Sequence, residues 1–200
     1  MALHDDICDL FIEWDRFKFL FSSQKQVVLL DETASLFFRY IQRIMLNDVI
    51  LHISRLTDKK DMGKNKNLTI LCLPDLFDVP ETKEKKEKID CLCDAALKTV
   101  ENIREVRHKL LAHSGKNIAL KLSPAPGLKK YVKQVDDAIA AICEPLNKIC
   151  QFSSEPSFCI NSNSGIWDSA GGDVDRLIEV IKAGNVALKQ VACSPKIKPV

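Results

Sequence analysis

Apolar residues recur every three to four positions through most of this chain, and the strict alternation of a half-buried strand is nearly absent. This period is that of amphipathic helices, so the pattern predicts an all-α protein. Helices are expected over about residues 5–21, 33–57, 82–113, 128–150 and 173–191. The first four are enough for an up-and-down four-helix bundle, with the fifth as a C-terminal helical extension.

Polar and turn-forming stretches separate these helices. Residues 58–67, DKKDMGKNKN, are expected to form a flexible loop, and SPAPG at 123–127 is a turn-rich connection. The 200 residues suffice for one substantial core. We therefore expect one helical bundle over residues 1–150, and over residues 151–200 a loop followed by a helix that packs on the bundle.

The composition of the chain argues against a membrane protein, a secreted protein and a metal-binding or disulfide-rich protein. No uncharged apolar run of about 18 residues occurs, and the first residues are acidic, which predicts neither a membrane helix nor a secretory signal. The eight cysteines are scattered without a CxxC pair. They are expected to be free thiols in a reducing cytoplasm, with no metal site and no disulfide framework.

The charge of this chain is informative where basic residues cluster along the sequence. The net charge is +2, but residues 104–133 hold eight Lys or Arg side chains against the single acid Glu105. Such an excess can attract a polyanion such as RNA, or it can be an ordinary solvated surface. The charge pattern alone leaves both interpretations open.

Arg107 occupies an unusual position in the predicted helix 82–113. It lies in the middle of the apolar face, and no carboxylate stands three or four residues away on the same helix. Because an unpaired buried charge is costly, Arg107 needs an ion pair from another helix or an open interface that receives an anion. The apolar stripe around Arg107 also predicts a two-fold homodimer through residues 100–114.

His113 is the second candidate in this helix. It lies about 120° around the helix and about 9 Å along it from Arg107, just before the expected stop at Ser114 and Gly115. The helix dipole favours the imidazolium there, and His titrates close to neutral pH, so His113 suits proton transfer. Taken alone, it is more simply a histidine that caps the helix C-terminus.

Two segments together resemble a known family. RHKLLAH at 107–113 is similar to the signature of the HEPN superfamily, an Arg followed by a polar residue and, after a short spacer, a His. The pattern NDVILHISRLTD at 47–58, a polar loop and NLTIL at 67–71 resemble the abortive-infection, AbiU-type branch. The resemblance covers about residues 10–150.

This resemblance implies a helical bundle that dimerises with two copies of the motif facing each other. Many HEPN proteins are metal-independent endoribonucleases that act as toxins or in phage defence, whereas others only bind RNA or a partner. The motif would make Arg107 the phosphate ligand and His113 the acid or base, without metal or cofactor. Many members have Asn after the arginine, and His108 places an ionisable group there.

Four further basic residues are candidates for RNA contact, namely Arg104, Arg55, Lys109 and Lys116. Arg55 can also pair locally with Asp58, three residues later. The leading hypothesis is a cytoplasmic homodimeric HEPN-type endoribonuclease, with RNA and a cognate antitoxin as partners and no membrane association. The alternative is a non-catalytic dimeric module of the same fold that binds RNA or an antitoxin.

Overall fold

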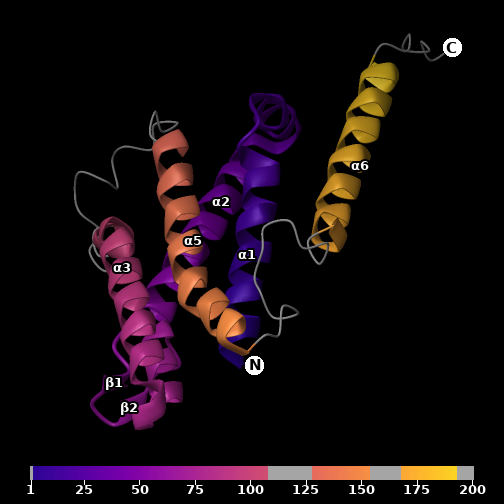
Figure 1. Cartoon of the computed structure of the whole chain (residues 1–200). Coiled ribbons are helices and arrows are strands. Elements are labelled where there is room, and N and C mark those ends of the chain that lie inside the picture. The colour runs from indigo at the N-terminus through magenta and orange to yellow at the C-terminus, as the bar shows by residue number, and fades with distance from the viewer. Residues whose placement is uncertain (1, 108–127, 154–167, 193–200) are drawn as a thin grey trace, which may run out of the picture.

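The computed structural model describes residues 2–107, 128–153 and 168–192 (Figure 1). The expected all-α class is confirmed. The helices are α1 (Ala2–Phe21), α2 (Gln24–Leu56), α3 (Lys83–Arg107), α5 (Leu128–Ser153) and α6 (Asp168–Ala192), with short 3₁₀ helices η1 (Ile70–Phe77) and η2 (Pro80–Thr82). None of these described helices combines the length and apolar character needed to span a membrane.

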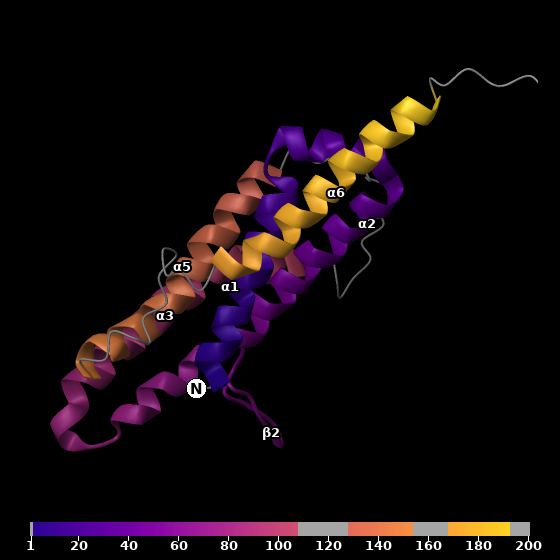
Figure 2. The ribbon, with the colours of Figure 1, turned by 90° about the vertical axis from the view of Figure 1, so that its right-hand side faces the viewer.

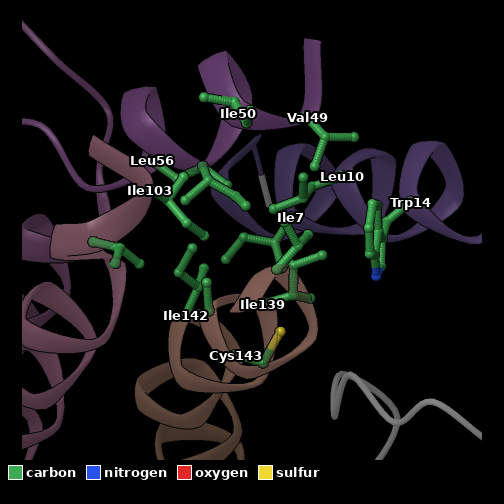
Figure 3. Packing of buried hydrophobic residues seen from close by; sticks show 14 of the residues in the cluster. Ile7, Leu10, Trp14, Val49, Ile50, Leu56, Ile103, Ile139, Ile142 and Cys143 are labelled. Atoms are coloured by element: carbon green, nitrogen blue, oxygen red, sulfur yellow. The ribbon is translucent and has the colours of Figure 1, made fainter. Parts of the chain in front are cut away.

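Four helices form the bundle. α1 packs on α2, α2 on α3, and α3 on α5, and α5 also contacts α1. Their apolar faces meet in one core that includes Ile7 and Leu10 from α1, Ile103 from α3 and Ile142 from α5 (Figure 3). Trp14 lies at its edge, where the indole Nε1 donates a hydrogen bond to Asp136 Oδ1 at 2.7 Å.

The long helix α6 lies against α1 and α2 (Figure 2). Val174 and Ile178 are buried in this contact, and Asn185 donates a hydrogen bond to Thr33 Oγ1 at 2.8 Å. The helix begins at Asp168, earlier than the expected Asp173, so Asp173 lies within the helix and does not cap it.

α2 differs from its predicted bounds at one end. The sequence predicts a helix from about residue 33, whereas α2 begins at Gln24 and is interrupted at Ala34, whose φ of −158° and ψ of 70° are not helical. The segment after this kink corresponds to the predicted helix. The helical turns before it were missed, because their apolar residues, 27–30, are consecutive and do not recur at helical spacing.

The connection after α2 is more ordered than expected. Instead of a flexible loop, it forms a two-stranded antiparallel hairpin, β1 (Asp61–Met62) and β2 (Asn65–Lys66). Gly63 has a φ of 67°, a conformation that side chains disfavour, so this glycine permits the tight turn. The side-chain amide of Asn67 donates a hydrogen bond to the carbonyl oxygen of Lys59 at 2.9 Å. This bond joins the end of the connection to its beginning.

Candidate active site at the ends of α2 and α3

Arg107 stands in the last turn of α3 and contacts the chain just beyond α2. Its Nη1 lies 3.7 Å from Oδ2 of Asp58, and Nη2 of Arg104 donates to Oδ1 of the same carboxylate at 2.6 Å. The two arginines at the helix C-terminus also suit the negative end of the helix dipole. One carboxylate therefore orients two guanidinium groups.

The cluster of Asp58, Arg104 and Arg107 is only partly covered. The side chains of Arg104 and Arg107 are 33% and 34% exposed. Two cations share one anion, so the cluster keeps an excess positive charge. The 3.7 Å separation exceeds hydrogen-bond length, so Arg107 is attracted by Asp58 without a close, bidentate contact. A phosphate arriving from solvent can use that guanidinium.

The prediction that Arg107 needs a partner from outside its helix is confirmed, since Asp58 supplies it. Val100 and Ile103 of the predicted dimer surface are almost fully buried, and they belong to the chain's own core. Residues 108–114 of the same surface lie outside the described residues, so the dimer stays a prediction.

Arg55 does not pair with Asp58 as expected. Its Nη2 donates to Oδ1 of Asp6 on α1 at 2.8 Å. The physical reason is that α2 ends at Leu56, so helical i,i+3 spacing does not extend to Asp58, which pairs with α3 instead. The guanidinium of Arg55 remains 64% exposed and is open to solvent.

His52, one turn before Arg55, is buried. Its Nδ1 lies 2.9 Å from Oε2 of Glu13, and its Nε2 lies 3.1 Å from Oδ1 of Asp6. Both ring nitrogens are thus occupied by carboxylates of α1. This geometry makes His52 a connection between α1 and α2 and leaves no ring nitrogen for a ligand.

The model of the HEPN_AbiU2 family, described as AbiU2, matches residues 2–167. The chain belongs to this family. The family is an abortive-infection branch of the HEPN superfamily, so the resemblance noted in the sequence is confirmed. Comparison with curated proteins and with solved structures found no match.

Four predicted site residues of this AbiU2-family chain lie outside the described residues, namely His108, Lys109, His113 and Lys116. Of the remaining candidates, the structure brings Arg104 and Arg107 together, and it places Arg55 in a separate ion cluster with Asp6. Asp58 is the residue of the site that sequence reasoning did not assign to Arg107.

The sequence offered only an indirect signal for Asp58. Arg107 lacked an acid on its own helix, and Asp58 is an acidic residue directly after a predicted helix. Pairing two residues 49 positions apart requires knowing which helix ends lie together. Because a local partner, Arg55, was also available, spacing favoured the wrong pair.

Two cysteines of the described part of the AbiU2-family bundle lie in its core. Burial raises the pKa of the Cys93 and Cys143 thiols to about 12, so these groups stay protonated at neutral pH. Cys93 donates a hydrogen bond to the carbonyl oxygen of Ile70 at 3.3 Å. Within residues 2–107, 128–153 and 168–192, no group of three His, Cys, Asp or Glu side chains is placed to hold a metal ion.

Proposed function

We propose that this AbiU2-family protein is a metal-independent endoribonuclease. It cleaves RNA in the cytoplasm, either in phage defence by abortive infection or as a toxin restrained by a cognate antitoxin. The observation that carries the proposal is the state of Arg107. This residue begins the HEPN motif, its side chain is one-third exposed, and its 3.7 Å contact with Asp58 leaves it able to bind an anion.

Cleavage of one phosphodiester bond requires a base, an acid and a group that stabilises negative charge on the phosphate. A base removes the proton of the ribose 2′-OH, the 2′ oxygen attacks phosphorus, and the P–O5′ bond breaks as an acid protonates the leaving oxygen. His113 supplies the proton transfers, and Arg107 stabilises the charge on the phosphate with its planar fork of N–H donors. The products are a 2′,3′-cyclic phosphate and a 5′-hydroxyl.

RNA on either side of the cleaved bond would be held by the neighbouring cations. Arg104 shares Asp58 with Arg107 and is exposed to a similar degree, so it can contact an adjacent phosphate. Arg55 is more exposed, and Lys109 and Lys116 follow Arg107 in the sequence. These phosphate contacts carry no sequence information, and they make RNA binding weaker at high salt.

The test is incubation of purified protein with mixed RNA in EDTA, with the product ends identified by mass spectrometry. Cleavage that leaves cyclic phosphate and 5′-hydroxyl ends, and that is lost in Arg107→Ala and His113→Ala, supports the proposal. Binding of RNA or of an antitoxin without cleavage by any variant would instead identify a non-catalytic HEPN module. Cleavage that requires added metal would contradict the proposed mechanism.

A further inference from the structure

The hairpin that follows α2 is rich in lysine. Residues 59–66 contain four lysines and one acidic residue, Asp61. Lys60 is occupied, because its Nζ donates to both carboxylate oxygens of Asp75 in η1, at 2.6 and 2.8 Å. The other three lysines, at positions 59, 64 and 66, are exposed. Asp61 lies opposite Lys66 in the strand register, so its charge offsets one of the three.

The first turns of α3 hold the same number of lysines, but their charges are balanced there. Three of them pair with carboxylates, Lys83 with Glu87, Lys86 with Asp78 and Lys88 with Glu84. The fourth, Lys85, lies over the ring of Phe152. Among the described residues, by contrast, no acidic side chain lies within ion-pair distance of the three exposed hairpin lysines. The hairpin therefore presents positive charge that the chain itself balances only in part.

The order of the hairpin does not come from burial. A two-stranded hairpin is at best marginally stable alone, and β1 and β2 contact mainly each other. Polar contacts at its base hold it. The backbone N–H of Asn67 donates to the carbonyl oxygen of Lys60 at 2.7 Å, and the Lys60 side chain anchors the hairpin to Asp75. Figure 2 shows the hairpin projecting from the helical bundle, so the exposed lysines stand on an ordered arm.

The arm begins at the candidate active site. Lys59 directly follows Asp58, whose carboxylate contacts Arg104 and Arg107. The chain from Lys59 to the turn at Gly63 spans about 13 Å in an extended conformation. The arm thus carries the positive charge of the site outward by about this distance.

Positive charge beside a phosphate-binding arginine suits a nucleic-acid strand. Such a strand has one phosphate per nucleotide, so a strand bound at Arg107 offers further negative charges on either side. A lysine ammonium is a compact charge on a flexible stem, so it can contact these phosphates without a fixed geometry and without reading a base.

We propose that the arm of residues 59–66 binds the phosphate backbone of RNA outside the cleavage site, through Lys59, Lys64 and Lys66. The choice of RNA rests on the proposed ribonuclease function, but binding by the arm requires no cleavage. These contacts carry no sequence information. They favour an RNA that extends beyond the reacting phosphate over one that ends there.

The first test measures binding without turnover. The probe is a single-stranded RNA of about 12 nucleotides with methylated 2′-OH groups, which lacks the nucleophile of the proposed reaction. The hairpin variant, with Lys59→Ala, Lys64→Ala and Lys66→Ala together, should bind it about tenfold more weakly at physiological salt. The slope of log affinity against log salt should fall by about 2, since each phosphate contact to a single strand contributes about 0.7. Fluorescence anisotropy over a salt series measures both.

The matched control removes three exposed lysines elsewhere, Lys25 at the start of α2 and Lys182 and Lys189 on α6. The control variant, with all three changed to Ala, loses the same net charge. Its affinity should stay within about twofold of wild type, because the effect depends on where the charge stands. Circular dichroism should show the wild-type Tm for both variants, since all six side chains are exposed.

Cleavage gives a second readout. For the wild type, KM should be lower for the longer RNA with unmodified 2′-OH groups than for a dinucleotide, because only the longer strand reaches the arm. In the hairpin variant this advantage should shrink about tenfold, through a higher KM for the longer RNA.

Equal affinity of the hairpin variant and the wild type would overturn the proposal, and so would an equal loss in the control variant. Either result would make the hairpin lysines an ordinary solvated surface. A hairpin variant that keeps the full KM advantage for longer RNA would also contradict it. Binding lost only in the hairpin variant, with no cleavage by the wild type, would support the arm and refute the ribonuclease proposal, so the two can fail separately.

Discussion

Two ion clusters at the end of α2 use similar residues in different ways. His52 lies between Asp6 and Glu13 of α1, with both ring nitrogens hydrogen-bonded and 7% of its side chain exposed. Six residues later, Asp58 binds Arg104 and Arg107 of α3, and both arginine side chains are about one-third exposed. We call the first cluster closed, because its histidine is enclosed, and the second open, because its arginines are partly exposed.

The difference shows that residue type alone does not identify a functional site. A histidine near neutral pKa is a common catalytic group, yet His52 has no ring nitrogen left for substrate. An arginine in an ion pair is commonly structural, yet the Arg107 side chain is one-third exposed and shares its carboxylate with a second cation. The open cluster can exchange its partner for a phosphate, whereas opening the closed cluster would remove two contacts between α1 and α2.

Substitutions at Arg107 should give the largest effect. Arg107→Ala removes the phosphate ligand of the proposed reaction, so we expect RNA cleavage to fall about 10²-fold or more and RNA binding to weaken. Arg107→Lys should not restore cleavage fully, since an ammonium cannot make the bidentate contact. Single-turnover assays in EDTA measure both variants. Cleavage by both at the wild-type rate would remove Arg107 from the site.

His52→Ala should affect stability and spare cleavage. It removes two hydrogen bonds to carboxylates and leaves Asp6 and Glu13 facing each other, so we expect a loss of about 2 kcal/mol, or a decrease in Tm of about 4–8 °C. The carboxylates are partly exposed and recover some hydration, which keeps the loss below that of a fully buried pair.

The control for this prediction is His4→Ala in the first turns of α1, where the imidazole contacts the exposed Asp5 and Sγ of Cys8. Its Tm should change little. Cleavage per folded molecule should be the same for wild type and both histidine variants. A specific loss of cleavage in His52→Ala at unchanged Tm would mean that the closed cluster serves the reaction.

Asp58→Asn should strengthen RNA binding but lower the turnover number. Removing the negative charge raises the positive potential of the cluster, so RNA should bind about threefold more tightly. The turnover number should nevertheless fall, because an amide holds Arg107 less firmly than a carboxylate does. Asp58→Glu should recover turnover in part. A purely structural Asp58 would instead lower stability by about 1 kcal/mol and leave the binding affinity and turnover number of the folded protein unchanged.

These contrasts also show how much of the fold could be predicted from the sequence. The helical period located α1, α3, α5 and the straight part of α2, because each buries a continuous apolar face. The same period does not show which apolar residues of α2 are covered, since Ile44 and Val49 are both hydrophobic and only tertiary packing leaves Ile44 exposed and Val49 buried. It also missed the helix before Ala34 and the hairpin at Gly63.

For the candidate site, sequence reasoning identified Arg107 and its need for a distant partner but not Asp58. Local spacing assigned that carboxylate to Arg55, because helical neighbours are visible in a sequence and the meeting of two helix ends is not. The surroundings of His52 are equally invisible in the sequence. Its neighbours Asp6 and Glu13 are 46 and 39 positions away, so their contact is a product of the fold.

Arg55→Ala should have the smallest effect and is the most direct check on how the two clusters divide their roles. Arg55 donates to Asp6 at 2.8 Å, but its side chain is 64% exposed, so solvent screens the pair and the cost should be at most about 0.5 kcal/mol. Asp6 also keeps its contact with His52, which joins α1 to α2 without Arg55.

If Arg55 contacts RNA phosphate, its loss should weaken RNA binding two- to threefold at low salt and less at high salt, because such contacts act through counterion release. Fluorescence anisotropy over a salt series measures this, with Arg39→Ala as the control, because Arg39 is an equally exposed arginine of α2 that pairs with Asp31 instead. Equal behaviour of the two variants would exclude Arg55 from RNA binding.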